Sequence, residues 1–435
     1  MHIAQFIQRY PPAIGGSEAY ARRLCEYLIA GGDEATVWTS NAVALEGMWW
    51  ANARPTAASD LSLLPAGREA RLQQYPPLHF PARRYVLKAL SLLPQRFWQC
   101  LTMPCNPICL GMWHDANRFG GPLDAVHAAA FPYSFPIACG LRLAQRRGVP
   151  FLITPFLHLG DPTNPNDRTR TKYTAPHLRW LLKQADRIFV QTRAERDAVI
   201  ALDVAEERVA LQGLGVEASE CTGGDRVAVR AAWRVQPEEI VIGHLANNSV
   251  EKGTVDLLCA AERAWVAGHR FRVLLAGPEM PNFRTFWNTF AHKNRVTRLG
   301  VLTESQKRDF FAGIDCFALP SRCDSFGLVL LEAWANGKPN IVYHAGGPGE
   351  LVRHKRDGLQ AACGDVDALA ACVGQLVADQ EYRRWLGNNG LARIATEFRW
   401  EDKLELVRNT IRELVGKNKT SSPRLTSSHL SQIVS

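Results

Sequence analysis

The sequence predicts a doubly wound α/β fold with two Rossmann-like domains that face each other across a cleft. Short apolar runs alternate with amphipathic helical segments, and the same rhythm restarts in the second half of the chain. The two halves are of similar size. Because open α/β sheets bind ligands outside the carboxyl ends of their strands, the cleft between the halves is the expected ligand site.

Composition limits the class of protein. Among 435 residues, 46% are hydrophobic and 21% are charged, which is the balance of a globular chain that can bury a core. The formal net charge of +9 is a mild bias toward anionic partners such as phosphates, nucleotides or a membrane surface. The charge is spread along the chain, so we expect no nucleic-acid partner.

The chain is expected to be cytoplasmic. Residues 1–6 lack the basic and apolar regions of a signal peptide, and no apolar run reaches the length of a membrane span. The 11 cysteines are therefore expected to be reduced thiols. Cys100, Cys105 and Cys109 cluster, but without the spacing of a zinc site, and we expect no metal there.

The first strand–helix–strand unit spans about forty residues. An apolar strand is expected at residues 3–7, and Gly15-Gly16-Ser17 then precedes a helix with Ser17 as its N-cap. Gly31-Gly32 ends this helix, and the next strand is expected at residues 35–39.

Residues 75–113 differ from their surroundings because they contain no Asp or Glu. They do contain four scattered cations, Arg83, Arg84, Lys88 and Arg96. One interpretation is a surface that meets an anionic membrane or a lipid-linked acceptor. The other, which we favour, is an amphipathic helix packed on its own domain, since Pro81 and Pro94 keep helices short.

The alternation continues to the end of the second half. Further strands are expected at residues 126–128, 151–154, 188–191, 209–211, 240–245, 271–276, 296–299, 316–319 and 340–343. Residues 217–230 are polar and glycine-rich and are expected to be a linker. Thr303 and Gln306 form a capping box at the start of one helix. A last helix is expected at residues 400–414.

The sharpest signal lies in residues 319–339, which are expected to form a strand, a polar loop, a helix and a strand. Asp324 lies at the mouth of this helix and Glu332 about two turns in. Free backbone amides at the helix start suit an anion or sugar hydroxyls; they belong to Phe326, Gly327 and Leu328. The alternative is that Asp324 only caps the helix and Glu332 is solvated.

This segment resembles the Glu-x7-Glu signature of retaining glycosyltransferases of family 4, which have the GT-B fold. Further segments resemble the same family in the same order. They are Gly15-Gly16-Ser17-Glu18, residues 154–158, residues 185–190, Gly215-Val216-Glu217, Glu251-Lys252-Gly253, and Gly346-Gly347 followed by Glu350. The resemblance covers about residues 1–415.

Two departures from the family pattern stand out. The first acidic position holds Asp324 where the family usually has Glu, and Ser325 follows where Gly is frequent. The family also pairs its lysine with an arginine in a Gly-Arg-Leu type turn, and this chain has His244 in that place. The diphosphate would then keep Lys252 but lose one cation.

The resemblance implies a role for each site residue. Lys252 would hold the donor diphosphate, assisted by backbone amides of Gly16, Phe326, Gly327 and Leu328. Glu332 would accept hydrogen bonds from the ribose hydroxyls, and Asp324 would position the sugar hydroxyls. His158 would approach the sugar or the acceptor; the alternative is a buried histidine with its hydrogen bonds satisfied.

The resemblance also implies the reaction. A hexosyltransferase-type enzyme would move sugar from a nucleoside-diphosphate sugar to a hydroxyl of a glycan or glycolipid, in cell-surface polysaccharide or glycoconjugate synthesis. The leaving phosphate would act as base, without metal or cofactor. The acceptor domain would span residues 1–220 and the donor domain 221–400. Residues 401–415 would cross back as a helix, and 416–435 would be a disordered tail.

Other functions are weighed against this one. A dinucleotide dehydrogenase is disfavoured because the G-x-G-x-x-G fingerprint is absent. A nucleotide-sugar epimerase or a hydrolase on the same fold remains open. A non-catalytic protein that binds nucleotide sugar or a partner also remains open, since Asp324 and His244 replace residues usual in the family.

Overall fold

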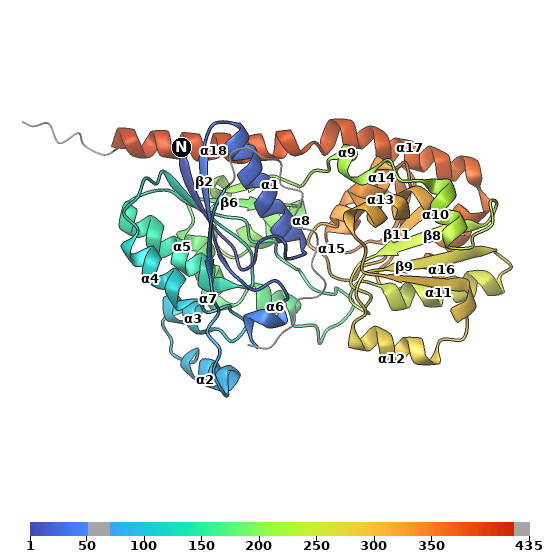
Figure 1. Ribbon diagram of the computed structural model, residues 1–435. Coiled ribbons are helices and arrows are strands. Elements are labelled where there is room, and N and C mark those ends of the chain that lie inside the picture. The colour runs from blue at the N-terminus through green and yellow to red at the C-terminus, as the bar shows by residue number, and fades with distance from the viewer. Residues whose placement is uncertain (51–69, 422–435) are drawn as a thin grey trace, which may run out of the picture.

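The computed structural model describes residues 1–50 and 70–421. Within these ranges, parallel strands form one sheet of seven strands and another of six. The two sheets lie side by side with helices packed around them (Figure 1). The predicted two-domain, Rossmann-like α/β fold is confirmed.

The first sheet has the order β3-β2-β1-β4-β5-β6-β7. Its strands are β1 (His2–Phe6), β2 (Glu34–Ser40), β3 (Arg71–Tyr75), β4 (Ala125–Ala128), β5 (Phe151–Ile153), β6 (Arg187–Val190) and β7 (Val209–Leu211). The helices of this half are α1 (Gly16–Ala30), α2 (Arg83–Leu90), α3 (Arg96–Thr102), α4 (Leu110–Arg118), α5 (Ser134–Arg147), α6 (Thr169–Tyr173), α7 (Pro176–Gln184) and α8 (Arg193–Ile200).

The second sheet has the order β10-β9-β8-β11-β12-β13. Its strands are β8 (Ile240–Leu245), β9 (Phe271–Ala276), β10 (Val296–Gly300), β11 (Cys316–Leu319), β12 (Asn340–Tyr343) and β13 (Gly358–Ala361). The helices of this half are α11 (Thr254–Val266), α12 (Pro281–Thr289), α13 (Glu304–Gly313), α14 (Leu328–Ala335), α15 (Gly346–Leu351), α16 (Val366–Ala378) and α17 (Gln380–Glu397).

The central strands form because most of their residues are apolar and are covered on both faces. Every residue of β1, β11 and β12 is buried. A parallel sheet between helices needs such continuous runs instead of an alternating pattern. This explains why the predicted bounds of β11 and β12 agree with the structure, and the capping box of Thr303 and Gln306 is confirmed too.

The start of α1 differs from the prediction. The helix begins at Gly16, so Gly15 takes the cap position and no side chain caps it. The hydroxyl of Ser17 donates instead to Glu18 Oε2 at 2.8 Å and accepts from Gln8 Nε2 at 3.1 Å. Glu18 is in turn bound to Arg9 at 2.7 Å. Ser17 therefore belongs to a polar network beside the glycine loop. The spacing of residues in the sequence does not predict this network.

The predicted linker over residues 217–230 is wrong. Two short helices, α9 (Ala218–Cys221) and α10 (Arg226–Ala232), occupy most of this range. Both pack on α13 of the second half. Some of the polar residues that suggested a linker form ion pairs from α10 to the second half.

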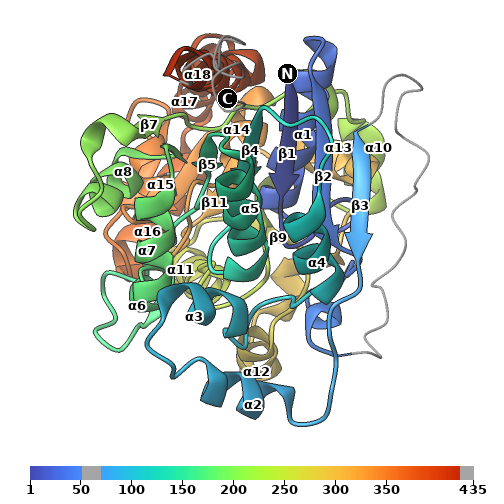
Figure 2. The same ribbon diagram turned by 90° about the vertical axis from the view of Figure 1, so that its left-hand side faces the viewer.

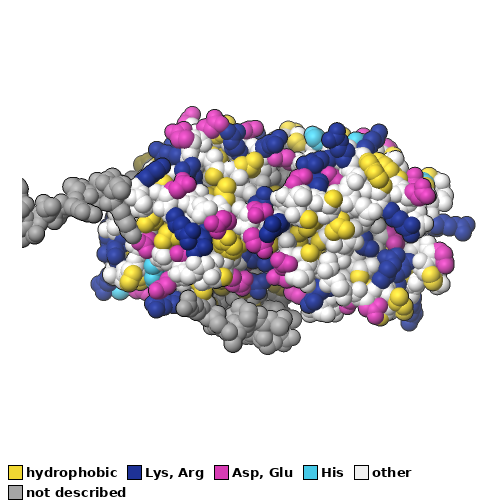
Figure 3. Space-filling model, turned by 90° about the horizontal axis from the view of Figure 1, so that it is seen from above, with side chains coloured by type: hydrophobic (Ala, Val, Ile, Leu, Met, Phe, Trp, Pro, Cys, Tyr) yellow, Lys and Arg dark blue, Asp and Glu magenta, His cyan; other side chains and the backbone are white. Residues whose placement is uncertain are grey.

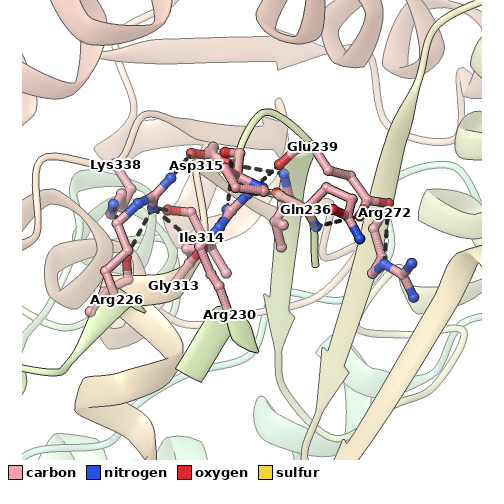
Figure 4. Close-up of polar contacts among 12 residues, drawn as sticks. Arg226, Arg230, Gln236, Glu239, Arg272, Gly313, Ile314, Asp315 and Lys338 are labelled. Atoms are coloured by element: carbon pink, nitrogen blue, oxygen red, sulfur yellow. Dashed lines mark hydrogen bonds and ion pairs between the residues drawn. The ribbon is translucent and has the colours of Figure 1, made fainter. Parts of the chain in front are cut away.

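Two arginines fasten α10 to the amino end of the second sheet (Figure 4). Arg226 binds Asp315 at 2.6 Å, and Arg230 binds the same carboxylate at 3.2 Å. Arg230 also donates to the carbonyl oxygen of Gly313 at 3.1 Å. Asp315 directly precedes β11, so α10 is anchored to the sheet on the side away from the strand carboxyl ends.

The chain returns to the first half through α18 (Trp400–Ser421), which lies over that half in Figure 1. The predicted disordered tail is wrong for residues 416–421, because they continue this helix. Val415 is buried, and Asn418 Nδ2 donates to the carbonyl oxygen of Gly148 at 3.4 Å, so contacts with the first half support the last turns. The rest of that predicted tail lies outside the described residues.

Candidate active site

Four of the predicted site residues lie beyond the carboxyl ends of strands from both sheets. Gly16 begins the helix after β1, and the loops after β5, β8 and β11 carry His158, Lys252 and Asp324. The two halves meet here, with Nδ1 of His158 at 3.8 Å from Sγ of Cys323. A side-chain carbon at Gly16 would lie 3.9 Å from Cδ1 of Leu328, at the start of α14. The structure thus brings predicted residues of both halves together.

Lys252 and Asp324 form an ion pair in this region. Asp324 lies in the loop of residues 320–327, called the motif loop below. Nζ of Lys252 donates to Oδ2 of Asp324 at 2.6 Å, and the side chains are 24% and 14% exposed. Burial acts to raise the pKa of Asp324, but the ammonium group outweighs it and holds the pKa below its ordinary value. An anion that binds Lys252 must therefore compete with an ionised carboxylate.

The loop that carries Lys252 presses directly on the motif loop. Gly253 has a φ of 73°, and a side-chain carbon there would collide with the carbonyl group of Pro320. The amide of Arg322 donates to the carbonyl oxygen of Glu251 at 2.9 Å. The two loops are therefore held together by backbone contacts.

The motif loop rests on the glycine pair Gly346-Gly347. The amide of Gly347 donates to the carbonyl oxygen of Asp324 at 3.0 Å. A side chain at Gly347 would collide with the backbone of Ser325 and Phe326, so only glycine permits this approach. The pair, which the family resemblance singled out, supports the loop that holds Asp324.

Helix α14 begins at Leu328 and not at Phe326 as predicted. Gly327 precedes it with a φ of 93°, a left-handed conformation that delays the helix. The backbone of Phe326 also helps to hold the pKa of Asp324 below its ordinary value. Because the helix starts later, Glu332 lies just over one turn in, not two.

Glu332 is paired on one oxygen and open on the other. Its Oε1 lies 2.9 Å from Nζ of Lys307, whereas Oε2 is buried and has no hydrogen-bond partner within the described ranges. Burial raises the pKa of Glu332 despite the opposing effect of Lys307. A buried acceptor without a donor is unfavourable, so this atom favours a ligand hydroxyl. Lys307 was not predicted, because nothing in the local sequence distinguishes it from a solvated helical lysine.

His158 is neutral and held in a fixed loop. Burial, together with the nearby Lys252, lowers the pKa of His158 to about 4. Its ring lies 4.9 Å from the ring of Tyr173. The preceding amide, of Leu157, donates to Oε1 of the buried Glu195 at 2.7 Å. Glu195 was not predicted; its only sequence signal is its position in the first turn of α8.

His244 replaces the family's usual arginine, and it is a buried structural residue. Its Nδ1 lies 2.8 Å from the carbonyl oxygen of Ala318, and its Nε2 lies 2.8 Å from Oγ1 of Thr254. Burial lowers the pKa of His244 to about 4. A neutral imidazole with both nitrogens engaged supplies no positive charge to a diphosphate, in line with the expected loss of one cation.

Glu350 joins the two halves near this site. Its Oε1 accepts from the amide of Arg193 at 2.7 Å, and its Oε2 accepts from the amide of Ala194 at 3.0 Å. These amides begin α8, so a carboxylate of the second half caps a helix of the first. The family resemblance had marked Glu350 without indicating this contact.

A hollow of about 460 Å³ opens beside Lys252. Its size is within the range of small-molecule sites. The lining comes from the loop after β8 and from the start of α12. It consists of Asn247, Ser249, Glu251, Lys252, Met280, Pro281 and Asn282.

No cluster of three or more His, Cys, Asp or Glu side chains suited to a metal ion occurs in residues 1–50 and 70–421. The metal-free reaction remains a prediction.

The thiols of Cys100 and Cys109 are buried and lie 3.6 Å from carbonyl oxygens. In the same part of the chain, no helix is long and apolar enough to cross a membrane.

Both halves match known protein families. Residues 15–215 match the family described as "Glycosyl transferase 4-like domain", and residues 225–393 match "Glycosyl transferases group 1". The chain belongs to the GT-B glycosyltransferases of the group 1, family 4 type. The resemblance carried by the motifs is thereby confirmed for family and fold.

Curated glycosyltransferases are similar to this chain over the regions that match. The D-inositol 3-phosphate glycosyltransferase of Mycobacterium marinum is 28% identical over 243 residues, covering 54% of this chain and 52% of that enzyme. The chain thus matches about half the length of that relative. The 2-deoxystreptamine N-acetyl-D-glucosaminyltransferase of Streptomyces fradiae is 26% identical over 393 residues, covering 86% and 85%.

Solved structures share the fold of this chain over nearly its whole length. Sucrose-phosphate synthase from Thermosynechococcus elongatus has a TM-score of 0.72 at 20% identity, covering 96% of this chain and 99% of that one. Anabaena Alr3699/HepE in complex with UDP and glucose has a TM-score of 0.68 at 17% identity, covering 95% and 100%. At these identities the likeness establishes the fold.

Proposed function

We propose that the protein is a retaining glycosyltransferase that moves a sugar from a nucleoside-diphosphate sugar to an acceptor hydroxyl. One observation carries the proposal. The ammonium group of Lys252 binds the carboxylate of Asp324 across two touching loops, and the helix after the second loop carries Glu332, a carboxylate with one unpartnered oxygen. A diphosphate, sugar hydroxyls and ribose hydroxyls are the groups that these side chains would bind.

Each side chain then has a distinct task. The diphosphate replaces Asp324 as the partner of the Lys252 ammonium group. The carboxylate of Asp324 can then accept hydrogen bonds from the sugar hydroxyls. The open Oε2 of Glu332 accepts from a ribose hydroxyl. The neutral His158 supplies a hydrogen bond from the opposite half and adds no second positive charge.

The reaction breaks the bond between the anomeric carbon and the diphosphate oxygen. The acceptor oxygen forms the new bond on the same face of the sugar, and its proton passes to the leaving phosphate. Lys252 stabilises the negative charge that develops on the leaving group, and the remaining contacts hold both substrates in place. No residue of the chain needs to exchange a proton, and no metal is required.

The donor base is tested with a thermal-shift panel of UDP, GDP, ADP, TDP and their common sugar conjugates. A ligand at about 100 times its dissociation constant stabilises the folded state by about 2.7 kcal/mol, which melting curves resolve. A shift with one base identifies the donor class. Stabilisation by none of them contradicts the proposal and favours the non-catalytic alternative, as does binding without turnover across an acceptor panel.

We propose that the acceptor hydroxyl belongs to a glycan or a lipid-linked glycan of a cell-surface polysaccharide or glycoconjugate. The relatives named above act, by their names, on an inositol phosphate and an aminocyclitol, so polyhydroxylated rings are a common acceptor type among them. An acceptor panel should therefore contain free cyclitols, oligosaccharides and lipid-linked sugars, with product linkage determined by NMR.

We also propose peripheral contact with an anionic membrane at the cytoplasmic face. The region of α2 and α3 projects from the first half on the side opposite α18 (Figures 1 and 2). The face along α17 and α18 carries interspersed acidic and basic side chains (Figure 3). Residues 75–113, in contrast, contain no acidic residue.

The exposed side chains of this region suit a lipid surface. Tyr85 and Leu92 are 76% and 77% exposed, and Leu93 is 49% exposed. Arg84 and Lys88 are exposed cations of α2. Exposed apolar and basic groups together are typical of segments that lie in the membrane interface.

Arg83 does not belong to this surface, although the sequence grouped it with the other cations. It is buried, and its guanidinium donates to the carbonyl oxygens of Leu78 at 3.0 Å, Pro104 at 3.1 Å and Asn106 at 2.5 Å. Arg83 therefore fixes the base of α2 and should be kept in any membrane-binding variant.

The membrane proposal is tested by flotation with anionic phospholipid vesicles at low salt. Arg84→Gln with Lys88→Gln should weaken capture by roughly 2 kcal/mol, at about 1 kcal/mol for each cation. Arg384→Gln with Arg412→Gln makes the same charge change on α17 and α18 and should leave capture unchanged. Equal loss in both variants, or no capture of the natural protein, would overturn the proposal.

A further inference from the structure

Arg322, in the motif loop, binds one carboxylate from each half of the molecule. Its guanidinium lies 2.7 Å from Oδ2 of Asp256 in α11, which belongs to the same half as the motif loop. It also lies 3.1 Å from Oδ2 of Asp161, in the loop after β5 of the other half. A planar guanidinium can hold two carboxylates at once, which an ammonium group does poorly.

These ion pairs are well shielded from solvent. The side chains of Arg322, Asp161 and Asp256 are 20%, 12% and 10% exposed. Burial acts to raise the pKa of Asp161, but hydrogen bonds from Thr163 and the guanidinium of Arg322 hold it below its ordinary value. Asp161 is therefore ionised, and its attraction to Arg322 is screened less than that of a surface pair.

The carboxylate of Asp161 is fixed before it meets Arg322. Its Oδ1 accepts from the amide of Thr163 at 2.8 Å and from the hydroxyl of the same residue at 2.7 Å. Its own amide donates to Oδ2 of Asp167 at 2.5 Å. Oδ1 of Asp161 is thus engaged within its own loop, and Oδ2 is the oxygen that binds Arg322 of the other half.

The positions of these residues tie the ion pair to the candidate active site. Arg322 precedes Asp324 by two residues, and its amide holds the loop of Lys252 through Glu251. Asp161 follows His158 by three residues. The contact between Arg322 and Asp161 therefore links the loop that carries one set of predicted site residues to the loop that carries the other.

We propose that Arg322 is a positioning residue that couples closure of the two halves to the placement of Asp324. When Asp161 is bound, the motif loop and the His158 loop are held together and water is kept from the sugar. When the carboxylate of Asp161 is removed, the ion pair between Arg322 and Asp256 still holds the motif loop in place, but the two halves separate more readily. The proposal rests on the proposed function for its catalytic part and on geometry for its closure part.

Closure is tested first, without any substrate. Small-angle scattering of the ligand-free protein should show a larger radius of gyration for Asp161→Asn than for the natural protein. Asp256→Asn is the matched control, since it removes a carboxylate from the same guanidinium within one half. It should lower the melting temperature without enlarging the molecule. Identical scattering curves for all three proteins would overturn the closure part.

The catalytic part is tested by comparing sugar transfer with donor hydrolysis. Asp161→Asn should keep the thermal shift given by the nucleoside diphosphate, lower kcat for transfer at least about tenfold and raise the share of donor lost to water. Arg322→Lys should retain more transfer than Arg322→Gln. If the nucleoside diphosphate binds neither the natural protein nor any variant, the proposed function is wrong. If it binds and Asp161→Asn transfers sugar at the normal rate, only this inference is wrong.

Discussion

Arg408 in α18 donates from Nε to Oδ2 of Asp33 at 2.7 Å, although 375 residues separate them in the chain. The pair is nearly buried, with side chains 12% and 6% exposed. On the same side of α18, Tyr27 donates to Glu405 at 2.6 Å. A helix that follows the second half in the sequence therefore packs on the first half and is held there by polar contacts.

Arg408→Ala should destabilise the protein because it leaves the carboxylate of Asp33 without this partner. A hydrogen bond to a charged group contributes about 1.5–3 kcal/mol, and we expect a loss of that order in the free energy of unfolding. Urea unfolding measures it. Arg412→Ala, which removes an exposed arginine one turn away, should change stability by less than about 0.5 kcal/mol.

Lys252→Ala should lower turnover by at least about tenfold, since the developing charge on the leaving phosphate loses its cation. Steady-state kinetics with the donor found in the thermal-shift panel provide the measurement. Turnover close to that of the natural protein would refute the assignment of Lys252 to the diphosphate.

Asp324→Asn should reduce turnover more than nucleotide affinity. In the proposed function the carboxylate holds the sugar, whereas Lys252 and Glu332 hold the diphosphate and the ribose. Calorimetric titration with the nucleoside diphosphate, set beside kcat, separates the two effects. A parallel decrease in both would mean that Asp324 only shapes the motif loop.

Glu332→Gln should weaken nucleotide binding because the carboxylate that we propose binds the ribose loses its charge. Glu304 provides a matched control, since it also binds Lys307, at 2.8 Å, but its side chain is 71% exposed. Glu304→Gln should therefore leave the dissociation constant unchanged. If both variants weaken binding equally, the effect comes from Lys307 and not from a contact with the ligand.

His244 should make stability depend on pH below neutrality. Its pKa is about 4 in the folded protein, against an ordinary value of 6.5. The unfolded chain therefore takes up this proton first as the pH falls, and the free energy of unfolding decreases between about pH 6.5 and 4, by up to about 1.4 kcal/mol per pH unit for one proton. His244→Gln should flatten this part of the profile in unfolding experiments. An unchanged slope would show that His244 titrates normally.

Much of the fold was predictable because its signals are local. The buried strand β11 is a continuous apolar run, β12 is apolar after Asn340, and the capping box at Thr303 is a pattern within four residues. The error at the start of α1 has the opposite cause. Ser17 is a good cap by type, but Glu18, which tertiary contacts with Arg9 hold in place, engages its hydroxyl.

The site was predicted as a set of residues but not as a set of contacts. Motif resemblance named Lys252, Asp324 and Glu332, yet the pairing of the first two depends on loops 72 residues apart. Lys307 and Arg322 were missed because a charged residue looks alike in sequence whether it is solvated or bound to a buried carboxylate. Such roles depend on distance in space, which periodicity does not encode.

The position of α18 has a consequence for the order in which the protein matures. Val407 and Ile411 of this helix share a hydrophobic cluster with Leu24 and Leu28 of α1. During synthesis, the apolar side of α1 leaves the ribosome long before its cover does. At about 5–20 residues per second, the nascent first half waits roughly 10–40 s for that helix while the second half is made. A chaperone that shields apolar helices would be needed most in this interval.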